Sequence, residues 1–240
     1  MQFTDKLQQG ILIRRYKRFL ADIETEQSEF TIHCPNTGSM KNCQDPGSRV
    51  WFTDSNNPNR KYPCTWQVVE VNHQHLVGIN TGIANTLVRE AIESGVVKEL
   101  AGYSTIRNEV PYGEQKSRID LLLEGGDTHQ DVPCYVEIKN VSLGLKGGLG
   151  VFPDAVTTRG HKHLRELMHM KAEGARSVLM FCVQHEGIDL VKPADDIDAE
   201  YGRLLREAST KGVEILAYKA DFDIENSAVQ LTTSIPVELN

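Results

Sequence analysis

The sequence predicts a mixed α/β protein in which a small β-barrel at the N-terminus precedes a mixed sheet with helices packed on it. Short strand-like segments joined by turns fill the first 80 residues. Beyond Asn80, segments of helical and of strand periodicity follow one another. The chain has 240 residues, of which 40% are hydrophobic, as is typical of a globular protein with a sizeable core. We therefore expect one domain over residues 1–82 and a second over residues 83–240.

The barrel prediction rests on closely spaced strand candidates in the N-terminal third of the chain. Turn-forming residues separate them, for example the segments Cys-Pro-Asn-Thr-Gly-Ser from Cys34 and Asp-Ser-Asn-Asn-Pro-Asn from Asp54. Short strands at this spacing indicate a small barrel. The predicted strands span residues 10–15, 19–24, 30–33, 50–53, 65–71 and 76–80.

The second domain begins with a predicted helix that Asn85 could cap and that runs to about residue 100. Leu87, Val88 and Ala91 recur there at helical spacing. A later helix over residues 157–173 should end at Gly174. The other predicted elements are strands at 105–110, 117–124, 132–140, 177–184 and 213–218 and a helix at 198–210. This order, α-β-β-β-α-β-α-β, predicts a mixed sheet covered by helices.

The charge is unevenly distributed along the chain. The net charge is −7, but residues 186–240 carry 12 acidic and 5 basic residues, whereas residues 139–176 carry 7 basic and 3 acidic ones. A local basic surface is therefore compatible with the acidic total. No apolar run approaches the roughly 18 residues of a membrane span, and the N-terminus lacks the organisation of a signal peptide. Five cysteines without a CxxC pair favour free thiols, so we expect a cytoplasmic protein.

Three side chains carry the predicted chemistry. Glu137 and Lys139 are two residues apart on one predicted strand, so they share a face of it. A hairpin through Gly125 and Gly126 could bring Asp120 of the preceding strand beside Glu137. Two carboxylates suit Mg²⁺ or Mn²⁺, which prefer oxygen ligands, and a bound metal can activate water for hydrolysis. A lysine beside them could orient that water or stabilise transition-state charge.

The competing interpretation of this pattern is a solvated Glu–Lys pair, because the bare spacing Glu-x-Lys occurs by chance in many proteins. The neighbouring Asp120, the apolar flanks of both strands and the basic helix that follows favour the catalytic interpretation. We therefore take Asp120, Glu137 and Lys139 as candidate catalytic residues, with Asp120 and Glu137 as metal ligands.

The arrangement Asp120…Glu137-x-Lys139 resembles the PD-(D/E)xK nuclease superfamily, although the usual proline before the first aspartate is Ile119 here. Four motifs in order extend the likeness to the sugar fermentation stimulation protein A (SfsA) family over essentially the whole chain. They are Cys-Pro-Asn-Thr-Gly-Ser-Met (34–40), Ser-Arg-Ile-Asp (117–120), Val-Glu-Ile-Lys-Asn (136–140), and Phe-Pro-Asp-Ala (152–155) followed closely by Arg-Gly-His-Lys-His-Leu (159–164).

The resemblance implies an N-terminal OB-like barrel and a C-terminal restriction-endonuclease-like domain of the order αβββαβ. It also implies non-specific DNA binding and a regulatory role in the metabolism of maltose and other sugars. Many such nucleases use a further acidic residue from the first helix. Glu90, Glu93 and Glu99 are the candidates, and we select Glu90 as a third metal ligand, with a solvated helix charge as the alternative.

Two basic segments are candidate DNA contacts. Near the start of the barrel, basic residues alternate with aromatic ones, as in folds that hold single strands by phosphate contacts and base stacking. If that strand is uninterrupted, Arg14 and Arg18 share one face. The N-terminus of the later helix favours anions. The predicted nucleic-acid contacts are Arg14, Arg15, Lys17, Arg18, Arg118, Arg159, His161, Lys162 and His163. For either histidine taken alone, a hydrogen-bonded surface histidine is the competing interpretation.

The sequence therefore predicts a cytoplasmic DNA-binding protein with a Mg²⁺-dependent phosphodiesterase site, without a membrane segment and compatible with a homodimer. The alternative is a non-specific DNA-binding regulator that keeps the fold but does not cut. For the barrel cations, a basic strand edge that discourages aggregation is the competing interpretation. A sugar-responsive module has no support in the residues themselves.

Overall fold

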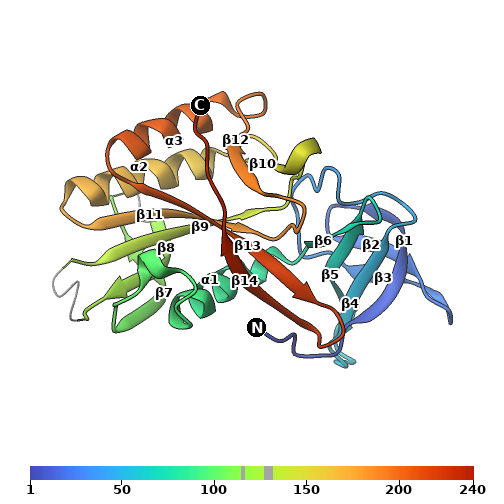
Figure 1. Cartoon of the computed structure of the whole chain (residues 1–240). Coiled ribbons are helices and arrows are strands. Elements are labelled where there is room, and N and C mark those ends of the chain that lie inside the picture. Colours follow the sequence, from blue (N-terminus) through green and yellow to red (C-terminus); the bar gives the residue numbers. More distant parts are fainter. Residues whose placement is uncertain (115–116, 127–131) are drawn as a thin grey trace.

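The computed structural model describes residues 1–114, 117–126 and 132–240. A barrel and a sheet covered by helices lie side by side, and the long strand pair near the C-terminus reaches from the sheet towards the barrel (Figure 1). The mixed α/β fold class is therefore confirmed. Among the described residues, no helix has the length and apolar character needed to cross a bilayer.

The barrel follows the predicted strand pattern. Its strands run in the order β3-β2-β1-β4-β5-β6, and pairing between β3 and β5 closes it. Alternating apolar residues such as Leu12, Ile23, Phe52 and Trp66 fill its core. Their bounds are β1 (Gln8–Tyr16), β2 (Leu20–Glu24), β3 (Glu29–His33), β4 (Arg49–Asp54), β5 (Cys64–Val71) and β6 (His75–Gly78).

The basic segment near the start of the barrel is not one strand. β1 ends at Tyr16, and Lys17 and Arg18 adopt positive φ angles of 50° and 64° in the turn to β2. Three residues, Lys17 to Phe19, form this hairpin loop, which is a common length for connecting antiparallel strands. A register shift also interrupts β1 between Leu12 and Arg14. The expectation that Arg14 and Arg18 share a strand face is therefore wrong.

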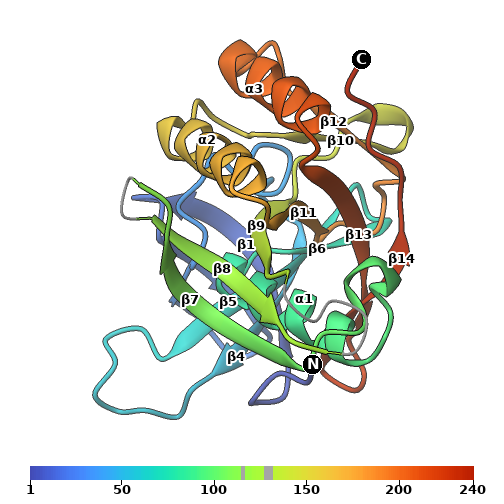
Figure 2. The same ribbon diagram turned by 90° about the vertical axis from the view of Figure 1, so that its left-hand side faces the viewer.

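The C-terminal sheet has the order β14-β13-β11-β9-β8-β7. β9, β11 and β13 are parallel, whereas β7, β8 and β14 run antiparallel to their neighbours. The helix α1 packs on one face and α2 and α3 on the other (Figure 2). The bounds are α1 (Ala84–Glu93), β7 (Thr105–Tyr112), β8 (Ser117–Glu124), β9 (Cys134–Val141), α2 (Thr158–Ala172), β11 (Arg176–Val183), α3 (Ala199–Thr210), β13 (Glu214–Asp223) and β14 (Ala228–Ser234).

Three details differ from the predicted elements. α1 ends at Glu93, because Gly95 takes a positive φ of 77°, and a short 3-10 helix, Lys98–Leu100, follows. Asn85 lies inside α1, and Asn80 instead caps the 3-10 turn Thr81–Ile83 before it. β14 and the parallel pair β10 (Leu149–Phe152) and β12 (Leu190–Pro193) were not predicted from the sequence.

Hydrogen bonds join the barrel to the C-terminal domain. The backbone N–H and the hydroxyl of Ser39 both donate to Oδ2 of Asp154, at 2.9 and 3.0 Å. Asn42 donates to the backbone oxygen of Gly144, and the backbone N–H of Gly78 donates to the backbone oxygen of Gln184. The bonds of Ser39 and Asn42 fix the loop after β3 beside the segment between β9 and α2.

Candidate active site at the fork between two strands

The candidate site lies where β8 and β9 diverge. Their antiparallel ladder ends at the pair Leu121–Val136, so Asp120 and Glu137 are the next residues on the two strands. The backbone N–H of Ile138 donates to Oδ2 of Asp120 at 2.7 Å. The carboxylate of Asp120 therefore takes the place of a strand partner at the start of this opening, which we call the β8–β9 fork.

Two donors hold Asp120, one from β9 and one from α1. Besides the bond from Ile138, Nδ2 of Asn85 on α1 donates to its Oδ1 at 3.0 Å. Burial and the negative charge of Glu137 raise the pKa of Asp120, although these two hydrogen bonds and Lys139 act in the opposite direction. The carboxylate is thus fixed in direction but is repelled by its neighbour across the fork.

Glu137 is only 2% exposed, and cationic or donor groups surround one of its oxygens. Lys139 Nζ donates to Oε1 at 2.6 Å, and Nδ1 of His163 on α2 contacts the same oxygen. Burial alone would raise the pKa of Glu137, but the hydrogen bond with His163 and the charge of Lys139 outweigh it and lower the pKa. Glu137 is therefore ionised at neutral pH.

The second oxygen of Glu137 bears on metal binding. Oε2 is buried and has no hydrogen-bond partner among the described residues. A buried carboxylate oxygen without a partner is costly, and a cation between Glu137 and Asp120 would both supply a partner and offset their repulsion. The described residues contain no group of three His, Cys, Asp or Glu side chains that could hold a metal. Mg²⁺ is commonly held by one or two carboxylates and keeps several waters, so the pair fits it.

Further polar groups that the sequence analysis did not assign to the site also face the fork. Asn85 is one of them, because it holds Asp120. Glu166 on α2 is 2% exposed, and Tyr112 is buried at the end of β7. Burial raises the pKa of Tyr112, and the charges of Glu137, Glu166 and Asp120 raise it further.

Glu90 does not join the carboxylate pair. Its side chain is 46% exposed and forms an ion pair with the N-terminal ammonium group, whose nitrogen lies 2.7 Å from Oε2 of Glu90. Asn85 is the α1 residue that reaches Asp120, and Glu90, five residues later, points roughly 140° away around the helix. Glu93 pairs with an arginine one turn earlier, and Glu99 accepts from a tyrosine of β13 at 2.7 Å.

The predicted DNA contacts on α2 divide into two pairs. Arg159 is exposed and Lys162 is half-buried, so both are at the surface. His163 is 5% exposed and lies in the fork beside Glu137, while His161 turns towards α3. The helix therefore presents two of its four predicted DNA contacts outward and turns the two histidines inward.

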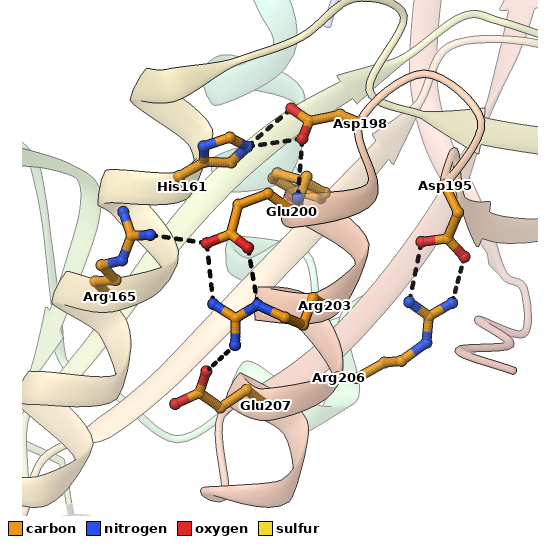
Figure 3. A network of polar contacts seen from close by, with 9 residues as sticks. His161, Arg165, Asp195, Asp198, Glu200, Arg203, Arg206 and Glu207 are labelled. Atoms are coloured by element: carbon orange, nitrogen blue, oxygen red, sulfur yellow. Dashed lines mark hydrogen bonds and ion pairs between the residues drawn. The ribbon is translucent and has the colours of Figure 1, made fainter.

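His161 belongs to a network that joins α2 to α3 (Figure 3). Its Nε2 lies 2.8 Å from both carboxylate oxygens of Asp198. Asp198 also accepts a hydrogen bond from the backbone N–H of Tyr201, and this bond caps α3. It accepts another from the backbone N–H of Thr157, the residue before α2. Nearby, Glu200 pairs with arginines of both helices. His161 thus holds the start of α2 in position.

The barrel cations also differ from one another. Arg14 is exposed but pairs with Asp22 at 2.8 Å. Arg15 is half-buried and donates to backbone oxygens of Arg18, Asn36 and Gly38, so it braces the loop that contacts Asp154. Lys17 and Arg18 lie exposed in the hairpin turn.

Arg118 lies two residues before Asp120 on β8 and is exposed. Its Nη1 donates to the backbone oxygen of Glu109 on β7 at 3.1 Å.

Comparison with known proteins extends the assignment to the whole chain. Residues 82–226 match the sugar fermentation stimulation protein RE domain, and residues 13–79 match the SfsA N-terminal OB domain. The chain belongs to the SfsA family. Sugar fermentation stimulation protein homologs of Shewanella loihica (strain ATCC BAA-1088 / PV-4) and Shewanella baltica (strain OS155 / ATCC BAA-1091) are each 55% identical to it. The first match covers 100% of both chains, and the second covers 92% of this chain and 93% of the relative.

The structure of Pyrococcus furiosus SfsA in complex with Ca²⁺ is similar over 99% of this chain and 98% of the other. The TM-score is 0.85 and the sequence identity 26%. The SfsA family therefore accounts for both domains, the OB barrel and the C-terminal domain with the restriction-endonuclease-like order α1-β7-β8-β9-α2-β11.

Proposed function

We propose that this protein binds DNA and hydrolyses phosphodiester bonds with Mg²⁺ or Mn²⁺ at Asp120, Glu137 and Lys139. The observation that carries the proposal is the β8–β9 fork, in which Asp120 and Glu137 follow the last pair of the two strands, the charge of Glu137 raises the pKa of Asp120, and Oε2 of Glu137 lacks a partner among the described residues. A purely structural Glu–Lys pair would satisfy both oxygens of the buried carboxylate.

The residues of the fork have separate roles. Asp120 and Glu137 would hold the metal, which when bound lowers the pKa of water and neutralises phosphoryl charge. Asn85 and the backbone N–H of Ile138 fix the direction of Asp120. The Ca²⁺ complex of the P. furiosus protein supports a divalent cation in this family.

Lys139 brings a positive charge to the place where negative charge develops. Its side chain is 12% exposed, and the bond to Glu137 limits its movement. An ammonium group so placed can hold a water or stabilise a phosphoryl oxygen in the transition state. Burial strengthens both effects, because fewer water molecules screen the charge.

DNA would reach this site along exposed cations of both domains. Arg118 and Arg159 border the fork, and Lys17 and Arg18 extend from the barrel. These residues would contact phosphates, which carry no sequence information, so binding should be non-specific and should weaken with salt.

The test is incubation of the pure protein with single-stranded, duplex and branched DNA in Mg²⁺, Mn²⁺ or EDTA. We expect metal-dependent cleavage that Glu137→Gln abolishes, while Glu93→Gln, an exposed acid of α1, serves as the matched control and cuts normally. Absence of cleavage in every combination, with DNA binding intact, would favour a DNA-binding regulator without catalytic activity.

A further inference from the structure

His163 occupies an unusual position for a residue of a surface helix. It lies in the second turn of α2, is 5% exposed, and Nδ1 of its ring contacts both Glu137 and Lys139, which also contact each other. On the outer side, Nε of Arg159, one turn earlier, donates to Nε2 of His163 at 3.3 Å. One imidazole ring thus connects an exposed cation with the buried carboxylate of the fork.

The neighbours of the ring determine where its proton lies. Arg159 can only donate, so Nε2 of His163 must accept, and a neutral ring then carries its proton on Nδ1. The contact between Nδ1 and Oε1 of Glu137 requires the same arrangement, because two acceptors would repel each other. Lys139 Nζ, 3.1 Å from Nδ1, donates to Glu137 instead.

This arrangement leaves the two oxygens of Glu137 in different environments. Oε1 accepts hydrogen bonds from both His163 and Lys139, whereas Oε2 has no hydrogen-bond partner among the residues that the structure describes. The bond from His163 therefore fixes the carboxylate so that the oxygen left for a metal is always the same one.

We propose that His163 is a positioning residue that holds Glu137 in its metal-binding orientation and that Arg159 holds His163 in the required tautomer. The proposal rests on the function proposed above, and it assigns to His163 a role inside the site rather than on the DNA. The bond to His163 uses only Nε of Arg159, and a guanidinium carries four further N–H donors. The same side chain can therefore contact a phosphate and support Glu137.

The test compares substitutions that keep or remove the Nδ1 donor. The side-chain nitrogen of asparagine can take the place of Nδ1, whereas that of glutamine corresponds to Nε2. His163→Ala and His163→Gln should weaken Mn²⁺ binding by roughly 10–100-fold, the usual effect of losing a partner that orients a ligand. His163→Asn should recover most of the affinity. His169→Ala, a histidine in the last turn of the same helix, is the matched control.

Mn²⁺ binding is measured by calorimetry without DNA, together with single-turnover cleavage and with DNA affinity in EDTA. We expect metal affinity and cleavage to fall together in His163→Ala while DNA affinity is unchanged. Arg159→Ala should weaken Mn²⁺ binding in the same direction, whereas Arg203→Ala, an exposed cation of α3, should not.

The outcomes separate the two proposals. If the parent protein neither binds Mn²⁺ nor cleaves, the proposed function fails and the inference fails with it. If the parent binds Mn²⁺ and His163→Ala binds it equally well, only the role of His163 is overturned. An asparagine variant as weak as the alanine variant would also contradict the donor role, and circular dichroism of each variant verifies that it is folded.

Discussion

Asp198→Ala should destabilise the protein while leaving its affinity for DNA unchanged. Asp198 is 4% exposed and accepts the backbone N–H groups of Thr157 and Tyr201 as well as the ring of His161 (Figure 3). The substitution removes the N-cap of α3 and leaves donors near the start of α2 without a partner. The structure assigns His161 to this network, whereas the sequence predicted that it contacts DNA.

The size of the effect follows from these contacts. Loss of an N-cap costs about 1 kcal/mol, and a buried donor left unpaired costs about 1–3 kcal/mol, so we expect a loss of about 2–4 kcal/mol. In a protein of this length that corresponds to a fall in Tm of roughly 4–16 °C. Asp195→Ala is the matched control, because Asp195 pairs with Arg206 at the surface. Such pairs contribute about 0–1 kcal/mol.

The pH dependence gives a second signature. Burial alone would raise the pKa of Asp198, but the bonds from Thr157, Tyr201 and His161 outweigh it and lower the pKa. A carboxyl whose pKa is lower in the folded state stabilises the protein above its unfolded pKa and loses that contribution as the pH falls through the folded value. The difference in Tm between the parent and Asp198→Ala should therefore shrink below about pH 4.

Thermal unfolding of the parent, Asp198→Ala and Asp195→Ala from pH 3 to pH 7, with DNA affinity measured in EDTA, tests this reasoning. A Tm of Asp198→Ala equal to that of Asp195→Ala at neutral pH would refute it. So would a His161→Ala variant that unfolds like the parent but loses DNA affinity, since His161 would then be a DNA contact.

Three further predictions concern the fork and the barrel. Lys139→Ala should slow single-turnover cleavage by ~10²–10³-fold while Mn²⁺ affinity by calorimetry survives or rises, and a rate equal to that of the parent would exclude its role. Asp120→Ala should abolish cleavage without weakening DNA binding in EDTA, and a large loss of binding there would mean that Asp120 supports the fold or DNA directly. The double variant of Lys17 and Arg18 should flatten the slope of log K against log[salt] on single strands by roughly 1.4, and an unchanged slope would remove this turn from the DNA surface.

The sequence was most informative where a periodic pattern spans a whole element. The predicted strand over residues 117–124 matches β8, and the helix over residues 157–173 differs from α2 by one residue at each end. Local patterns failed where a single backbone position decides. Val96 and Val97 continue an apolar pattern beyond α1, but Gly95 ends the helix. β10 and β12 are short strands that are far apart in the sequence and pair with each other only in the folded protein. Neither therefore shows a strand periodicity that the sequence alone would reveal.

The candidate site could be predicted in part. The spacing of Glu137 and Lys139 and the hairpin before them indicated which residues meet at the fork. The direction of His163 could not be read from the sequence, because a basic helix N-terminus gives the same signal whether its side chains face solvent or the sheet. The sequence does contain a signal for Glu166, since an acid on the apolar face of a helix is either paired or functional.

The central claim is that Asp120 and Glu137 together hold a divalent metal. Crystals of the protein soaked in Mn²⁺, with diffraction measured at a wavelength that gives an anomalous signal from manganese, test it most directly. We predict an anomalous peak in the β8–β9 fork at bonding distance from a carboxylate oxygen of Asp120 and from Oε2 of Glu137, and no such peak in Glu137→Gln crystals. A Mn²⁺ ion bound elsewhere while the fork stays empty, or a peak in the fork that persists in the Glu137→Gln variant, would contradict the account.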